Sequence, residues 1–284
     1  SGGVAHVVNN AYGLQCAGTM RRLARAMRVG RVDAVVQSTD KNFLVPVGGA
    51  VIAGADKETI EAIGQAYPGR ASAAPLQDLF ITLLSMGADG YRGLLREREG
   101  LAVHLRARLV EVAAKHGERV LDTPNNSISF GLTLDSLQTP EAPSGGGGGS
   151  GGIGGGGFDE TYLGSMLFTR CVSGTRVVRR GEVKTICGVK FTGFGSSFDD
   201  YPHSYLTAAC AIGVSRPEID RFIEVLDKSM TQFKKRQSKE EHKAKSGKIG
   251  GAKAAAGGAE ESPKEPAAIP IETDAQAGTK DLGN

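Results

Sequence analysis

Lys41 stands in a polar stretch between two apolar segments. The stretch is Gln-Ser-Thr-Asp-Lys-Asn-Phe, residues 37–43, so hydroxyl groups come just before the lysine. A lysine held in a cleft, where burial or cationic neighbours lower its pKa, is unprotonated and attacks carbonyl carbons. Lys41 is therefore a candidate Schiff-base nucleophile. A lysine in an ordinary loop at a strand junction has the same spacing, and this stretch alone favours that interpretation.

Arg70 lies in a turn that presents its side chain beside small residues. The turn is Tyr-Pro-Gly-Arg-Ala-Ser, residues 67–72, and its Pro-Gly pair fixes the backbone before the arginine. A guanidinium fork binds the oxygens of a phosphate or a carboxylate in bidentate fashion. An arginine in a surface turn is the alternative. The run Asn-Asn-Ala-Tyr-Gly that begins at Asn9 is equally unspecific by itself.

The elements that would position these residues alternate between strands and helices. Apolar runs predict the strands, and apolar residues at helical spacing predict the helices. This alternation favours an α/β or α+β architecture. The predicted strands are 4–8, 34–38, 43–47, 49–53, 127–134, 176–178 and 189–194, and the predicted helices are 15–29, 57–67, 75–86, 91–115, 162–169, 205–212 and 219–233.

Two stretches differ in composition from the rest of the chain. Residues 139–157 are almost entirely glycine, serine, proline and other small or polar residues, and from about residue 234 the chain is charged and rich in alanine and glycine. Neither stretch can bury enough apolar surface to order itself. We therefore predict a flexible insertion in the first stretch and a disordered tail in the second.

Charge and cysteine usage limit the class of protein. The net charge is only +3, so the charge of the whole chain does not argue for nucleic acid, and any basic surface must be local. The four cysteines are scattered without a Cys-x-x-Cys pair, which favours reduced thiols in the cytosol over a disulfide frame or a zinc site. No apolar run reaches the roughly 20 residues that cross a bilayer. The chain opens Ser-Gly-Gly without a methionine, so we expect its true amino terminus to be missing.

Four motifs taken together closely resemble one family. That family is the eukaryotic and archaeal O-phosphoseryl-tRNA:selenocysteinyl-tRNA synthase, also called phosphoseryl-tRNA selenium transferase. The resemblance runs from about residue 4 to residue 235, interrupted by the glycine-rich stretch. The motifs are HVVNNAYG at 6–13, RVGRVDAVVQSTDKNFLVPVGGAVIAG at 28–54, YPGRASAAP at 67–75 and LGSMLFTR at 163–170.

This resemblance implies an α/β fold of the aspartate-aminotransferase class, fold type I of the enzymes that use pyridoxal 5'-phosphate, and a homotetramer. Residues 1–138 would be the carboxy-terminal part of the cofactor-binding domain with its connecting helices. Residues 158–235 would form a small α+β carboxy-terminal domain. The insertion at 139–157 and the disordered tail at 236–284 complete the expected organisation. The amino-terminal half of the family is absent, so we expect this fragment alone to hold the cofactor weakly or not at all and to be inactive.

The resemblance also implies roles for individual residues. Lys41 would form the Schiff base with pyridoxal 5'-phosphate, and Asn9 would lie near the pyridine ring. An asparagine cannot hold the ring nitrogen protonated by charge, which suits β-elimination better than a more demanding carbanion reaction. Arg70 would grip the phosphate of the phosphoseryl group and stabilise it as it departs. Arg28, Arg170 and Lys235 would bind the tRNA.

The implied reaction is the conversion of O-phosphoseryl-tRNA(Sec) to selenocysteinyl-tRNA(Sec) in the cytoplasm, with loss of phosphate and addition of selenium from selenophosphate. One alternative is a non-catalytic tRNA-binding module or scaffold that kept only the basic helix, and Lys41 together with Arg70 favours the enzyme over it. Another alternative is a pyridoxal-phosphate lyase or decarboxylase that acts on small molecules. The match at Arg170 and Lys235, outside the lysine motif, argues against that alternative.

Overall fold

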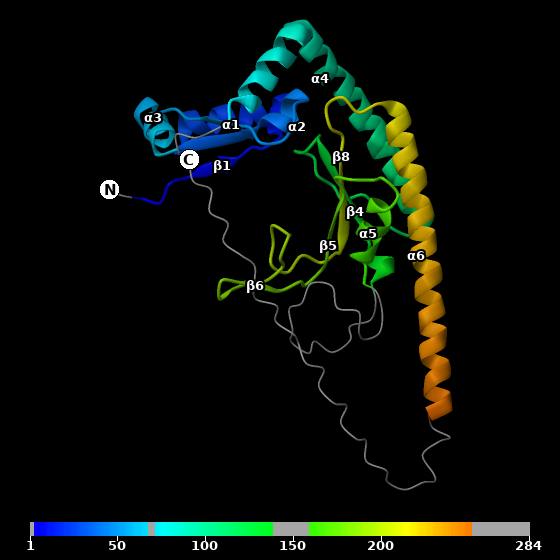
Figure 1. Ribbon diagram of the computed structural model, residues 1–284. Coiled ribbons are helices and arrows are strands. Elements are labelled where there is room, and N and C mark those ends of the chain that lie inside the picture. The colour runs from blue at the N-terminus through cyan, green and yellow to red at the C-terminus, as the bar shows by residue number, and fades with distance from the viewer. Residues whose placement is uncertain (1–2, 68–71, 139–158, 252–284) are drawn as a thin grey trace, which may run out of the picture. The chain divides into compact units, whose positions relative to one another are not determined.

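The computed structural model describes residues 3–67, 72–138 and 159–251 (Figure 1). Its first sheet has the strand order β1-β2-β3, with β1 at Val7–Asn9, β2 at Ala34–Ser38 and β3 at Ala50–Ala53. β1 and β2 are parallel, whereas β3 runs antiparallel to β2. A parallel pair needs a crossover connection, and the helix between β1 and β2 provides it.

That crossover is the short 3-10 helix η1 (Gly13–Gln15) followed by α1 (Ala17–Val29). Cys16 caps α1, because its sulfur accepts a hydrogen bond from the backbone nitrogen of Thr19. Gly30 ends the helix, as the sequence predicted. The arginines of α1 are exposed, which agrees with a helix that covers the sheet with its apolar side only; they are Arg21, Arg22, Arg25 and Arg28.

The strand predicted at 43–47 is wrong. A short helix, α2 (Thr39–Phe43), follows β2 directly and carries Lys41. It ends at Leu44, whose backbone is left-handed with a φ of 57°. The proline and glycines that follow have no place in a regular strand, so pairing resumes only at β3. The next helix, α3 (Lys57–Ala66), is close to its predicted bounds.

The two helices predicted at 75–86 and 91–115 form one bent element, α4 (Ala74–His116). The bend is at Gly87, whose φ of 67° is not helical, and Figure 1 shows α4 turning sharply there. α4 ends at Gly117, which also has a left-handed backbone. The part after the bend carries all the buried residues of the helix.

The second sheet has the order β4-β8-β5, with β4 at Ser129–Thr133, β8 at Tyr205–Ala209 and β5 at Arg176–Val178. Both pairs are antiparallel. The helix predicted at 205–212 is therefore wrong. Leu206 and Ala208 are buried whereas Tyr205 and Thr207 are only partly so, and this alternation is typical of a strand paired on both edges. A separate hairpin joins β6 (Lys184–Ile186) to β7 (Val189–Phe191).

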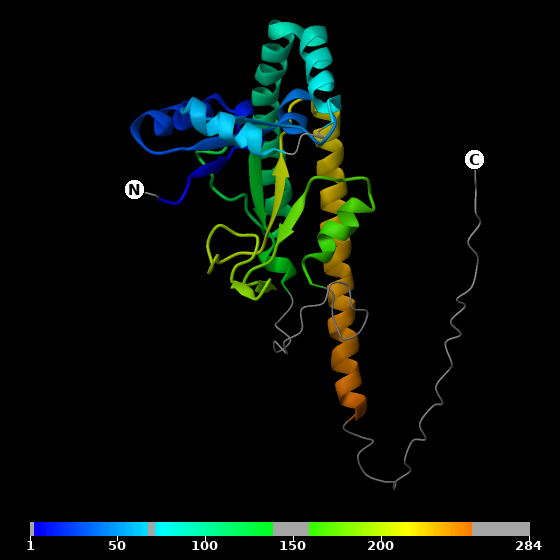
Figure 2. The same cartoon turned by 60° about the vertical axis from the view of Figure 1, so that its left-hand side comes forward.

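One apolar core joins this sheet to three helices (Figure 2). The helices are the second part of α4, α5 (Tyr162–Phe168) and α6 (Arg216–Gly251). The 3-10 helix η2 (Asp135–Leu137) also contributes a buried side chain. The core includes Leu105, Leu109, Leu132, Leu134, Leu137, Leu163, Leu167, Leu206, Leu226, Met230 and Phe233.

The expected domain limits differ from this arrangement. A border at residue 138 would divide the core, because β4 and the end of α4 pack with segments that follow residue 159. Residues up to Glu240 group into one compact unit. The disordered tail expected from residue 236 is wrong as far as residue 251, since α6 continues to Gly251. Lysine, arginine, glutamate and glutamine make up half of residues 236–251, and all four favour helix.

The insertion predicted at 139–157 and the tail after residue 251 lie outside the described residues. Within the helices that are described, none is long and apolar enough to span a membrane.

Candidate functional site

Lys41 lies on α2, one turn beyond the end of β2. Its Nζ is 3.0 Å from Oδ2 of Asp40, and 48% of its side chain is exposed. The hydroxyl of Ser38 donates to Asp40, and this bond is the main reason that the pKa of Asp40 is lowered; Lys41 lowers it further. Lys41 therefore faces an ionised carboxylate. The cleft that a Schiff-base lysine requires is, within the described residues, open to solvent on one side.

Gln15 fixes the backbone of Lys41. The glutamine side chain is only 3% exposed, and its Nε2 donates to the carbonyl oxygen of Lys41 at 2.5 Å. Its Oε1 accepts from the backbone nitrogen of Ile212 at 3.0 Å. Ile212 belongs to the connection between β8 and α6, so this one amide ties the lysine to a distant segment. The sequence predicted Gln15 only as the first residue of a helix, and its place two residues after the motif at 9–13 was the one signal that could have marked it.

Asn42 performs a second positioning task that the sequence analysis missed. It is fully buried, and its Nδ2 donates to the carbonyl oxygens of Ala11 (2.8 Å) and Ser38 (2.6 Å). These bonds join α2 to the end of β2 and to the turn after β1. The sequence offered a signal here too, since an asparagine followed the candidate lysine directly.

Lys41 lines one of two cavities that share wall residues. One, of about 440 Å³, is lined by Lys41, Gln15 and Asp40 among others. The other, of about 470 Å³, is lined by Asn9 and by asparagines of residues 125–126. Tyr12 and Ile128 line both. Asn9 is the last residue of β1, and its Oδ1 accepts from the backbone nitrogen of Ala11 at 3.1 Å. Lys41 and Asn9 thus border adjoining spaces.

Arg70 lies outside the described residues, which break off between 67 and 72. The residues on either side of that break, Tyr67 and Ser72, line a cavity of about 690 Å³ together with Thr39 and Asp40. The hydroxyl of Thr39 is buried there and has no hydrogen-bond partner among the described residues. Tyr67 and Ser72 therefore both lie beside the segment that precedes Lys41.

The three residues expected to bind tRNA occupy separate elements. Arg28 is exposed near the end of α1 and Lys235 is exposed on α6. Arg170 follows α5 and is half-buried, with Nη1 donating to the carbonyl oxygen of Met166 at 2.7 Å and Nη2 donating to Gln232. Arg170 therefore has a structural contact with α6, whereas Arg28 and Lys235 extend into solvent. No described contact joins the three.

Comparison with known proteins gives a consistent result. The model of the family "O-phosphoseryl-tRNA(Sec) selenium transferase, SepSecS" matches residues 2–231. A protein of that name from Dictyostelium discoideum is 48% identical over 228 residues, which cover 79% of this chain and 47% of the relative. The corresponding protein from Caenorhabditis briggsae is 40% identical over 239 residues, covering 84% and 46%. The chain spans about half the length of the curated relatives that it matches.

A solved structure agrees with these matches. The crystal structure of an archaeal O-phosphoseryl-tRNA(Sec) selenium transferase is similar with a TM-score of 0.63 and 28% identity. The similar region covers 79% of this chain and 44% of the archaeal one. The expected fold class, α/β of the aspartate-aminotransferase type, is confirmed.

Proposed function

Because the chain belongs to the O-phosphoseryl-tRNA(Sec) selenium transferase family, we propose that it carries the catalytic lysine for converting O-phosphoseryl-tRNA(Sec) to selenocysteinyl-tRNA(Sec). Selenophosphate would be the selenium donor. One observation carries the proposal: Lys41 projects from α2 beside a cavity of about 440 Å³, with its backbone held by a buried glutamine. A non-catalytic scaffold would have no need of that support.

The residues around Lys41 fit pyridoxal 5'-phosphate, the cofactor of this family. The cavity has the size of a small-molecule site, for which roughly 300–1,000 Å³ is usual. It offers the one group that the cofactor's aldehyde requires, a primary amine, and Tyr12 gives it an aromatic wall. When bound, the cofactor supplies an electron sink for negative charge at Cα of the amino acid. Asn9 would offer an amide rather than a charge to the ring, from the adjoining cavity.

Lys41 would act as the base that removes the Cα proton, after which phosphate leaves from Cβ and selenium adds there. Only the neutral amine can take a proton. The Nζ atom of Lys41, however, is engaged in an ion pair with the ionised carboxylate of Asp40, 3.0 Å away. We therefore infer that the side chain of Lys41 must leave Asp40 before it acts, and its half-exposed position leaves it room to do so.

Arg70 would bind the phosphate of the substrate and stabilise it as it leaves. Support comes from its neighbours along the chain, since Tyr67 and Ser72 line the cavity that Asp40 also borders. Arg28 and Lys235 would contact phosphates of the tRNA, because both are exposed. Arg170 would contact the RNA with the N–H groups that are not used in its hydrogen bonds to Met166 and Gln232.

We infer a homotetramer in the cytoplasm, as the resemblance implies. The chain spans about half the length of its curated relatives, and the site around Lys41 is open within the described residues. Other polypeptide segments would then close the site, and the 284-residue chain by itself would be inactive.

Covalent trapping tests the lysine directly. Reduction with borohydride in the presence of pyridoxal 5'-phosphate, carried out on a longer protein that includes the amino-terminal residues of the relatives, should attach the cofactor to Lys41. Peptide mapping by mass spectrometry identifies the modified residue. Lys41→Ala should abolish the attachment, whereas Lys57→Ala, which removes an exposed lysine of α3, should leave it unchanged. Attachment that survives Lys41→Ala would remove this residue from the site. The same variants of the longer protein, assayed with phosphoseryl-tRNA, test the activity.

A further inference from the structure

Arg98, on α4, is a buried cation without a counter-charge in the described part of the chain. Its side chain is 1% exposed, and its one hydrogen bond runs from Nη1 to the carbonyl oxygen of Ser127 at 3.1 Å. Nε and Nη2 are enclosed and have no partner among the described residues. A buried guanidinium is ordinarily paired with an anion, because an unpaired charge is costly to remove from water. The surroundings of Arg98 should therefore accommodate an anion.

The unpartnered atoms define the geometry of that anion. Nε and Nη2 carry hydrogens along one edge of the planar guanidinium. The remaining terminal nitrogen, Nη1, donates to the carbonyl oxygen of Ser127. The free edge presents two parallel N–H groups. Two oxygens of a carboxylate or a phosphate match this spacing in a bidentate pair.

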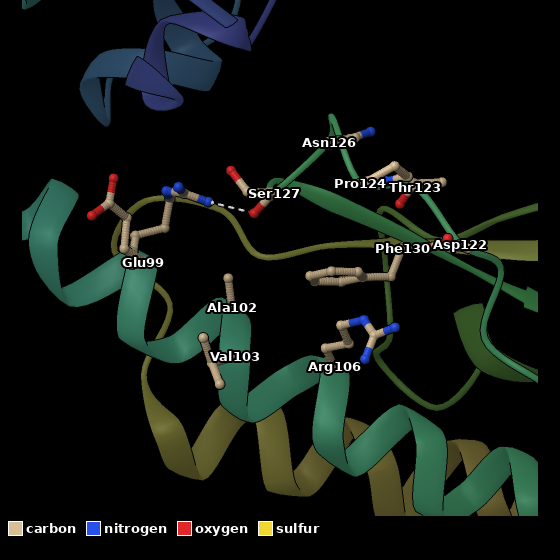
Figure 3. A pocket seen from close by; sticks show the side chains of 11 residues that line it. Glu99, Ala102, Val103, Arg106, Asp122, Thr123, Pro124, Asn126, Ser127 and Phe130 are labelled. Carbon is tan, nitrogen blue, oxygen red and sulfur yellow. Dashed lines mark hydrogen bonds between the residues drawn. The ribbon is translucent and has the colours of Figure 1, made fainter. Parts of the chain in front are cut away.

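A cavity of about 360 Å³ adjoins Arg98, between α4 and residues 122–127 (Figure 3). We call it the Arg98 cavity. Ala102, Val103 and Phe130 form an apolar part of its wall, and Figure 3 shows the Phe130 ring extending over the helix. Arg106 adds a second guanidinium, since it lies eight residues after Arg98 and hence on the same helix face.

Two carboxylates, those of Glu99 and Asp122, also line this cavity, but neither forms an ion pair with Arg98. Glu99 follows Arg98 directly, and adjacent residues of a helix do not face each other. Asp122 is exposed, as is Arg106, so these two belong to the rim. Neither acidic group therefore pairs with the enclosed edge of Arg98, and a ligand in the cavity reaches Nε and Nη2 only when the side chains that cover them move aside.

We propose that the Arg98 cavity binds an oxyanion, a carboxylate or a phosphate group, through the Nε and Nη2 edge of Arg98. The remainder of the ligand lies against Phe130 and Ala102. The oxyanion has two sources, a small organic acid or phosphate ester and an acidic side chain of a polypeptide segment outside this chain. This site is separate from Lys41, and its test does not depend on the proposed reaction.

The test measures thermal unfolding and calorimetric heat for the 284-residue chain titrated with acetate and with inorganic phosphate at constant ionic strength. Specific binding should raise the Tm in a saturable way. Arg98→Met should raise the Kd of the anion about tenfold or more, because it removes the charge-assisted hydrogen bonds between the guanidinium and the anion. Arg96→Met is the matched control, since Arg96 is exposed on the same helix, and it should bind as the wild type does. Equal titrations of the wild type and Arg98→Met would overturn the proposal.

A second variant guards against misfolding of the first. Arg98→Lys keeps the charge but loses the two-pronged edge, so it should bind both anions more weakly, and unchanged affinity would also overturn the proposal. Repeating the titration on a longer protein that includes the amino-terminal residues of the relatives separates the two sources. A persistent response indicates a free anion. A lost response, with Arg98→Met now destabilising, indicates that an acidic side chain occupies the cavity.

Discussion

The side-chain amide of Gln15 donates to the carbonyl oxygen of Lys41 across 2.5 Å. The same amide accepts from the backbone of Ile212, 197 residues further along the chain. The candidate catalytic lysine is thereby held to the segment that leads into α6. Any movement of that segment would be transmitted to the lysine through a single buried side chain.

Gln15→Met should lower the free energy of unfolding. It keeps the volume but leaves the carbonyl oxygen of Lys41 and the nitrogen of Ile212 without partners, and each such buried group costs about 1–3 kcal/mol. Urea denaturation measures the change. Gln65→Met on the exposed side of α3 is the control, and we expect it to change stability by less than about 0.5 kcal/mol. Equal stability of the two variants would contradict a clamping role for Gln15.

The bend of α4 predicts opposite effects for two glycines of the same helix. Gly87 has a φ of 67°, where an added Cβ strains the backbone, so Gly87→Ala should destabilise the fold by about 1 kcal/mol or more. Gly93 is helical and an added Cβ meets no atom within 4 Å, so Gly93→Ala should stabilise the fold by up to about 1 kcal/mol. Thermal or urea unfolding of both variants checks the signs. Two changes in the same direction would show that Gly87 does not need its left-handed backbone.

Asp227 predicts how stability depends on pH. It accepts from Nζ of Lys115 at 2.6 Å and from Nε2 of His116 at 2.7 Å. Burial raises the pKa of Asp227, but the hydrogen bonds and the charges of Lys115 and His116 together outweigh burial, and the pKa is lowered. A carboxyl group whose pKa is lower in the folded state adds stability above its unfolded pKa of about 4. That stability is lost as the pH falls through the folded value.

The free energy of unfolding of the wild type should therefore decrease as the pH is lowered below about 5. Asp227→Asn should show a shallower decrease, because the amide does not titrate. Asp89→Asn removes an exposed carboxylate from α4 and should keep the slope of the wild type. Denaturation curves across this pH range decide the matter, and identical slopes for all three proteins would exclude a contribution from Asp227.

Arg28→Ala should weaken tRNA binding by the longer protein. An exposed arginine that contacts a phosphate releases a counterion, so the plot of log K against log salt should become shallower by about 1. Filter binding at several salt concentrations measures this slope. Lys57→Ala, which removes another exposed cation, should leave it unchanged. Equal affinity of Arg28→Ala and the wild type at every salt concentration would mean that Arg28 is an exposed charge of its helix that does not contact the tRNA.

The sequence predicted most elements of the first sheet, because the apolar run at 34–38 and the stop at Gly30 are local signals. It failed at 205–212, where leucine and alanine favour helix locally. Pairing with β4 and β5 on both edges outweighs that preference. Such pairing joins segments far apart in the chain, so no local pattern could reveal it.

The residues of the candidate site also divide into those that local sequence identifies and those that only the fold identifies. Lys41 and Asn9 belong to recognisable sequence motifs, and the structure places them at adjoining cavities. Gln15 and Asn42 act through burial and through contacts with distant backbone, as Arg98 does at its separate cavity. Polar residues of these types are mostly exposed in proteins, and therefore only the folded chain distinguishes them.

β4 precedes residues 139–158 and β8 follows them, yet these two strands pair along five residues and share one apolar core. A break of the backbone anywhere between residues 139 and 158 would leave two polypeptides held together by that pairing. The two pieces, produced separately, should reassemble when mixed, and the join between them offers a place to insert a reporter protein.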